Sequence, residues 1–183
     1  MKNMQRWQQL PKVEQWNVLT HWIGIPLTLI VWFIWMQPKL ENMTNSASLV
    51  IYVSSMLFLF AASGCYHFQI EDNRKHRARI LDHIGIFILI AGTYTPVCAL
   101  ALPEAVGKKL LVMVWSIAAI GVIKKIFFTG KWGKLSLFIY LLMGWLVVWD
   151  FPTIWLVFST EALLFLALGG FFFTVGAIFY AIK

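Results

Sequence analysis

The sequence predicts an all-α fold, a polytopic bundle of membrane helices. Two observations carry this prediction: 60% of the 183 residues are hydrophobic while 13% are charged, and apolar runs of near-bilayer length recur along the chain. One soluble core could not bury that much apolar surface. Residues 1–183 are therefore expected to form a single transmembrane domain. A soluble nucleic-acid-binding protein is excluded despite the net charge of +7.

Six apolar runs are expected to form the membrane helices, because a bilayer core requires about 20 residues. They lie at about 20–36, 47–68, 83–102, 109–128, 135–150 and 161–182. The fourth run is enclosed by lysine pairs, 108–109 and 124–125, whose snorkelling side chains are expected to extend it to bilayer thickness. After the fifth run, Asp150 and Pro152 predict a helix-breaking turn, with 154–158 forming a loop that returns to the interface.

The lysines and arginines predict the orientation. Twelve of the 15 fall at the two termini and in the second-to-third and fourth-to-fifth connections, and Lys39, Lys108 and Lys109 fall on the other side. By the positive-inside rule, both termini are expected in the cytoplasm. No cleavage site follows the first run, so no signal peptide is expected. Cys65 and Cys98 are expected at opposite depths, roughly 20 Å apart, and should form no disulfide.

Polar side chains gather at the cytoplasmic ends of three runs. These residues are Glu14, Asn17, Thr20 and His21 for the first run, Ser63 and His67 for the second, and Asp82 and His83 for the third. Intervals of three and four residues place Glu14, Asn17 and His21 on one helix face, and Ser63 and His67 on another. Asp82 is expected to open its helix, where the free N–H groups and the dipole favour an acid.

Carboxylate, imidazole and hydroxyl groups from three helix ends predict a metal or proton-transfer site. The alternative for each residue taken alone is ordinary solvation, because helix ends near lipid headgroups are close to water. Glycines predict close helix packing at Gly85 and Gly92 in the third run and at Gly169, Gly170 and Gly176 in the sixth. The basic segment 74–79 is expected to set topology, with binding to anionic headgroups as the alternative.

The pattern as a whole resembles the hemolysin III family, which is related to the progestin and adipoQ receptors, the adiponectin receptors and the alkaline ceramidases. The resemblance rests on motifs in chain order. They are Glu14-x-x-Asn17-x-x-Thr20-His21-x-x-Gly24, Ser63-x-x-x-His67, Asp82-His83-x-Gly85, Ala91-Gly92-Thr93-Tyr94-Thr95-Pro96, Met143-Gly144-Trp145, and Gly169-Gly170 with Gly176-Ala177-Ile178-Phe179-Tyr180.

The resemblance implies a seven-helix architecture with a zinc site on the cytoplasmic side and hydrolysis of a lipid amide. It assigns His67 as a zinc ligand, Asp82 as the carboxylate that orients a metal-bound water, and Ser63 as its neighbour. Two further ligands belong to a His-x-x-x-His motif in the seventh helix, and this sequence contains no such motif. The site is thus expected to be incomplete in this chain, with His21 and His83 at a suitable depth to substitute.

Two classes of function stay open at this point. One is a zinc-dependent membrane hydrolase, or a truncated remnant of one. The other is a non-enzymatic membrane protein, either a cytolysin or a receptor-like binder. Membrane lipids are the expected partners, nucleic acid is not, and the resemblance implies a bacterial inner (plasma) membrane location.

Overall fold

The computed structural model describes residues 2–42, 45–129 and 132–182. Within these ranges the regular structure is helical. Six helical segments are long and apolar enough to cross a membrane, and they span Lys12–Met36, Ala47–Phe68, Asp72–Ala101, Glu104–Phe128, Gly133–Val157 and Thr160–Ile182. The predicted all-α membrane fold is confirmed.

The helices follow one another with short connections. In chain order they are α1 (Lys2–Gln9), α2 (Lys12–Val31), α3 (Ala47–Phe68), α4 (Asp72–Pro96), α5 (Glu104–Phe128), α6 (Gly133–Gly144), α7 (Phe151–Val157) and α8 (Thr160–Ile182). A π-helical turn, Trp32–Met36, extends α2, and another, Val97–Ala101, extends α4 past Pro96. A 3-10 turn, Leu146–Asp150, joins α6 to α7.

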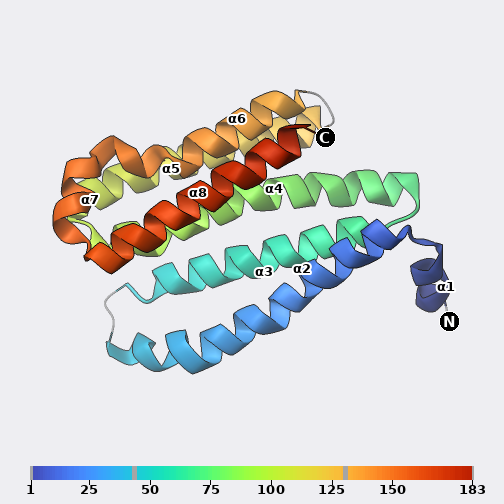
Figure 1. Ribbon diagram of the computed structural model, residues 1–183, viewed down its shortest axis with the longest axis horizontal. Coiled ribbons are helices and arrows are strands. Elements are labelled where there is room, and N and C mark those ends of the chain that lie inside the picture. Colours follow the sequence, from blue (N-terminus) through green and yellow to red (C-terminus); the bar gives the residue numbers. More distant parts are fainter. Residues whose placement is uncertain (1, 43–44, 130–131, 183) are drawn as a thin grey trace.

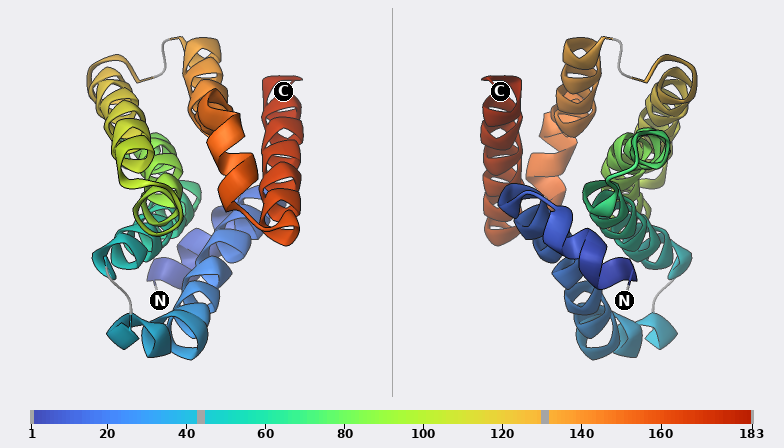
Figure 2. Two further views of the ribbon diagram at one scale, coloured as in Figure 1. Left: turned by 90° about the vertical axis from the view of Figure 1, so that its left-hand side faces the viewer. Right: turned by 90° about the vertical axis from the view of Figure 1, so that its right-hand side faces the viewer.

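Helix α4 lies at the centre of the bundle and packs against α3, α5 and α6. Helix α2 packs against α3 on one flank, and α8 packs against α6 on the other (Figure 2). Because consecutive long helices run in opposite directions, the starts of α2, α4 and α6 meet the ends of α3, α5 and α8 (Figure 1). This end, which also carries both termini, is hereafter the site end.

The core is densest where α4, α5 and α6 meet. Phe87, Val114 and Met143 are fully buried there, and the Phe87 ring lies 4.5 Å from the Tyr140 ring, centroid to centroid. The Tyr94 hydroxyl donates to the Met143 carbonyl at 2.8 Å and accepts from a backbone N–H of the following turn. These contacts fix the α4–α6 distance through the middle of the bundle.

Close packing was predicted at Gly85 and Gly92, and the structure shows that α3 is the helix that packs against them. A Cβ atom added at Gly85 would lie 2.8 Å from Leu59 Cδ1, and one added at Gly92 would lie 2.2 Å from Ser55 Oγ. The same prediction is wrong for Gly169 and Gly176 in α8, where an added Cβ would meet no atom within 4 Å. The reason is that α8 packs mainly on α6 and leaves much of its own surface exposed.

Several helices begin before the apolar run that predicted them. Helix α2 begins at Lys12 rather than near 20, α5 at Glu104 rather than 109, and α4 at Asp72 rather than 83. Asp82 therefore does not open its helix, and it lies ten residues, about 15 Å, inside α4. The argument from the N-terminal dipole was wrong, because an apolar run marks the membrane-embedded part of a helix and not its first hydrogen-bonded turn.

The loop predicted at 154–158 is also wrong, because most of it belongs to α7. Pro152 stands in the first turn of that helix, where the missing N–H costs no hydrogen bond. Asp150 precedes the helix and accepts a 2.7 Å hydrogen bond from the Thr153 hydroxyl. The residues predicted to break the fifth helix thus begin α7, and α6 ends earlier, at Gly144. Cys65 is exposed near the end of α3, and Cys98 is buried beyond the end of α4.

Candidate functional site

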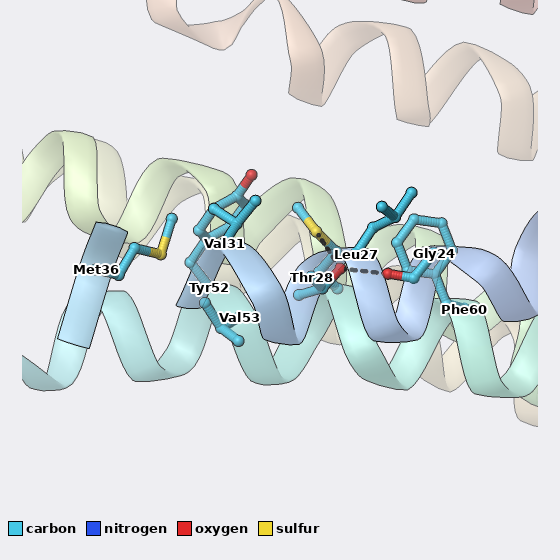
Figure 3. A pocket seen from close by; sticks show the side chains of 9 residues that line it. Gly24, Leu27, Thr28, Val31, Met36, Tyr52, Val53 and Phe60 are labelled. Atoms are coloured by element: carbon cyan, nitrogen blue, oxygen red, sulfur yellow. Dashed lines mark hydrogen bonds between the residues drawn. The ribbon is translucent and has the colours of Figure 1, made fainter. Parts of the chain in front are cut away.

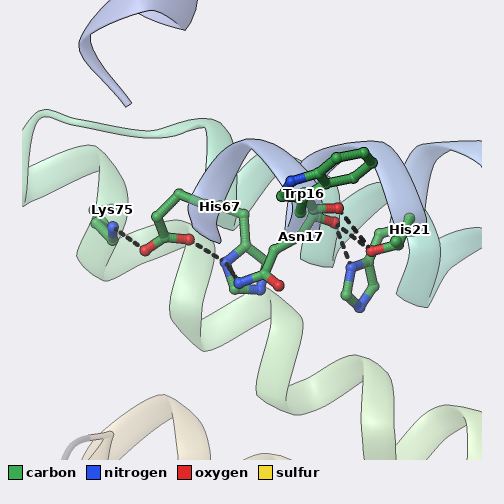
Figure 4. A network of polar contacts seen from close by, with 7 residues as sticks. Trp16, Asn17, His21, His67 and Lys75 are labelled. Carbon is green, nitrogen blue, oxygen red and sulfur yellow. Dashed lines mark hydrogen bonds and ion pairs between the residues drawn. The ribbon is translucent and has the colours of Figure 1, made fainter. Parts of the chain in front are cut away.

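Glu14 and His67 form the closest contact between polar side chains from two different helices at the site end. Glu14 lies in the first turn of α2 and His67 in the last turn of α3. Glu14 Oε2 is 2.5 Å from His67 Nδ1. Figure 4 shows the polar contacts around His67, with Lys75 on one side and Asn17 on the other. Both side chains are about four-fifths buried, with exposures of 23% and 18%. A carboxylate can only accept, so Nδ1 is the donor of this hydrogen bond, and in the neutral imidazole the lone pair is on the other ring nitrogen, Nε2.

Lys75 of α4 completes this contact on the far side of the carboxylate. Its Nζ donates to Glu14 Oε1 at 3.0 Å, and its ammonium also lies 5.5 Å from the centre of the Tyr66 ring. Glu14 thereby bridges α3 and α4 from α2. Segment 74–79 was predicted to set topology, and the structure shows that one of its residues also holds the candidate site.

Asn17 and His21 lie one and two turns further along the same face of α2. Asn17 Nδ2 is 3.5 Å from His67 Nδ1, and the His21 ring centre lies 5.5 Å from that of His67. His21 Nδ1 is 2.7 Å from the Asn17 carbonyl oxygen, which fixes the ring orientation. Thr20 does not join the group. Its exposed hydroxyl donates to the Trp16 and Asn17 carbonyls of its own helix.

Asp82 and Ser63 face each other across the α3–α4 contact. Ser63, His67 and His21 are the polar neighbours of the Asp82 carboxyl on α3 and α2. Ser63 is buried, with 4% of its surface exposed. The structure therefore brings together a polar cluster of six side chains, namely Glu14, Asn17, His21, Ser63, His67 and Asp82.

His83 does not belong to this polar cluster. Its Nδ1 lies 3.2 Å from Nζ of Lys125 in α5, and its carbonyl accepts a 3.0 Å hydrogen bond from the Tyr140 hydroxyl. Successive residues of a helix point about 100° apart, so Asp82 and His83 face different neighbours. Lys125 was expected to snorkel outward, and that expectation is wrong, because 4% of it is exposed.

The polar cluster was expected to form an incomplete zinc site. Among the described residues, no three His, Cys, Asp or Glu side chains are grouped closely enough to bind a metal. His67 has the chemistry of one ligand, because a carboxylate on Nδ1 is the usual way to direct Nε2 at zinc. A zinc site with three protein ligands does not fit the side chains of the polar cluster.

The cavity between α2 and α3 has a different character (Figure 3). It measures about 350 Å³ and is lined by apolar side chains such as Leu27 and Phe60. Its buried hydroxyl, Thr28, donates to the Gly24 carbonyl at 2.7 Å and approaches the Met56 sulfur at 3.2 Å. The lining is mainly apolar, and its size suits an acyl chain.

Comparison with known proteins gives one family. The model of the family described as "Haemolysin-III related" matches residues 10–183. The chain belongs to the hemolysin III family. It is 37% identical over 174 residues to a protein named Hemolysin-3 homolog from Bacillus subtilis (strain 168), an alignment that covers 94% of this chain and 82% of the relative. It is 34% identical over 181 residues to Hemolysin-3 from Bacillus cereus, covering 98% and 83%. No solved structure matches the chain.

Sequence reasoning missed two residues of this hemolysin III family protein that carry contacts at the site end, Lys75 and Lys125. Both stand in basic segments, whose charge was attributed to topology. A signal for Lys125 was available, because in α5 the intervals 114, 118, 121 and 125 place it on the same face as Val114, Ala118 and Gly121, all of which are buried. Lys75 has no comparable signal, since its partner lies 61 residues away.

Proposed function

We propose that this hemolysin III family protein is a membrane hydrolase that acts on lipid amides, with the polar cluster as its centre. The observation that carries the proposal is the meeting of Ser63, His67 and Asp82 at one place, supported from α2 by Glu14. The reaction class comes from the resemblance to the alkaline ceramidases.

The residues present supply two of the functions that amide hydrolysis requires. The Asp82 carboxylate is a proton acceptor placed in a half-buried position between two helices. His67 offers Nε2, because Glu14 occupies its other nitrogen. Zinc is the cofactor that the family resemblance implies, and His67 would be its first ligand. A complete site needs two more ligands than His67 alone provides.

The test compares two aspartates of one helix. The protein is reconstituted in vesicles and given a ceramide-type lipid amide with a fluorescent acyl chain, in the presence of zinc and a helical peptide bearing His-x-x-x-His, and in the absence of both. Asp82→Asn should slow hydrolysis at least about 100-fold. Asp72→Asn, at the exposed first turn of α4, should leave the rate unchanged. Absence of hydrolysis by the wild-type protein, or equal rates for the two variants, would refute the proposal.

A cytolysin is the second candidate, favoured by the name of the relative from Bacillus cereus, Hemolysin-3. It predicts that the purified protein releases haemoglobin from red blood cells. Lysis that persists in the Asp82→Asn variant would assign that activity to the bundle as a whole and not to the polar cluster.

A further inference from the structure

A second polar group lies at the site end, where α4 faces α5 and α6. Its centre is Lys125, an ammonium-bearing side chain that is 4% exposed. Nζ lies 3.2 Å from Nδ1 of His83, and among the described residues no carboxylate lies within 4 Å of it. Lysines are almost never buried this fully without a counter-ion. An anionic ligand would therefore stabilise the Lys125 ammonium group at this position.

The surrounding charges strengthen that requirement. Lys124 and Arg79 are the positively charged neighbours of Lys125, and Asp82 is its negatively charged neighbour. Lys124 Nζ is held beside the group by donating to the Ser136 hydroxyl at 3.0 Å. The carbonyl end of α5, where Lys125 lies in the last turn, offsets only about half of one positive charge. Three cations against one carboxylate leave an excess of positive charge.

Lys125 borders a cavity of about 290 Å³ between α4, α5, α6 and α8. Its polar wall carries Lys125, His83 and Ser136, and its apolar wall carries Leu137, Phe172 and Phe173. Phe172 is 67% exposed on the outside of α8, so the apolar wall continues to the surface that faces lipid. The cavity thus has a cationic part and an apolar part that leads to the membrane.

We propose that this cavity binds an anionic phospholipid, with the phosphate group at Lys125 and one acyl chain along Phe172 and Phe173. Lysine is a common phosphate ligand, acting as a point charge. Basic pockets between transmembrane helices are known places for anionic headgroups. The apolar wall favours a lipid over free phosphate, because free phosphate would leave that wall without a partner. The site is separate from the proposed hydrolysis and does not depend on it.

The first test removes the charge. The purified protein in neutral detergent is mixed with dioleoylphosphatidylglycerol or dioleoylphosphatidylcholine, and bound lipid is counted by native mass spectrometry. The wild-type protein should retain the anionic lipid at least tenfold better than the zwitterionic one. Lys125→Gln should abolish that preference. Lys134→Gln removes the same charge at the same end of the bundle, from an exposed residue outside the cavity, and should preserve the preference.

The second test blocks the acyl position without touching a charge. Gly176 borders the cavity, and an added Cβ there meets no atom within 4 Å. Gly176→Trp should therefore fold and fill the space, with at least tenfold weaker retention of the anionic lipid. Gly169→Trp is the matched control, because Gly169 has equal room two turns away and lies outside this cavity.

Three results would overturn the proposal. Equal retention of the two lipids would remove the headgroup preference. Equal retention by Gly176→Trp and Gly169→Trp would remove the acyl position. Displacement of the lipid by inorganic phosphate at equal concentration, with the same affinity in Gly176→Trp, would show a site for soluble phosphate instead of a lipid.

Discussion

Replacing Gly92 by alanine tests whether close approach of α3 and α4 holds the polar cluster together. The added Cβ would lie 2.2 Å from Ser55 Oγ and 2.8 Å from Ser55 Cβ. Rotating the hydroxyl relieves the first contact, but the second is fixed to the backbone of α3, so the two helices must separate. Overpacking of this kind costs about 1–3 kcal/mol, and alanine recovers up to about 1 kcal/mol of helix propensity.

The net expectation is a loss of about 1–2 kcal/mol in the free energy of unfolding. At about 2–4 °C for each kcal/mol in a chain of this size, the melting temperature should fall by about 2–8 °C. The assay is thermal unfolding in detergent followed by circular dichroism. Gly169→Ala gains the same propensity with no atom within 4 Å of the new Cβ, so it should raise the melting temperature or leave it unchanged.

A double-mutant cycle separates the steric reason from others. Ser55→Gly removes both atoms that the new methyl group meets, so Gly92→Ala should cost less in that background than in the wild-type protein. A Gly92→Ala variant as stable as Gly169→Ala would refute the reasoning. So would a Ser55→Gly background in which the cost of Gly92→Ala is undiminished.

Three further predictions concern the site and its side of the membrane. A cysteine replacing Arg77 should react with a membrane-impermeant reagent from the cytoplasmic side only. Labelling from the outside would show that the predicted orientation is wrong. The purified chain should bind well below one zinc ion per chain, and this number should rise when a helical peptide bearing His-x-x-x-His is added. If the chain alone binds one zinc ion, and His21→Ala or His83→Ala abolishes that binding, the site is built from different residues. Glu14→Gln weakens the contacts with His67 and Lys75. With that peptide present, the variant should therefore bind zinc with about 10–100-fold lower affinity than the wild-type protein. His76→Ala, at an exposed histidine, should not alter it.

The polar cluster was predictable in part because helix periodicity alone determines which residues share a face. Ser63 with His67, and Glu14 with Asn17 and His21, follow from intervals of three and four residues. The inclusion of His83 ignored the same rule, since adjacent residues cannot face the same neighbour. Periodicity could have shown that Asp82 and His83 face different sides of their helix. It could not have shown which of the two faces α3.

The sequence by itself determined that this chain lies in a membrane and how many times it can cross. The reason is physical: the free energy of transferring a run of about 20 residues into lipid depends on its composition and hardly on its neighbours. It also predicted that the helix carrying Gly85 and Gly92 packs closely on a neighbour, whereas the structure showed that this neighbour is α3.

Only the tertiary structure decided which polar groups meet. Lys75 bonds to Glu14, and Lys125 lies beside His83, because helices from distant parts of the chain pack at particular rotations about their own axes. That rotation depends on the sum of many side-chain contacts between neighbouring helices, none of which is visible in the pattern of a single segment. A lysine in a basic segment therefore has the same sequence signature whether it faces headgroups or is buried beside a histidine.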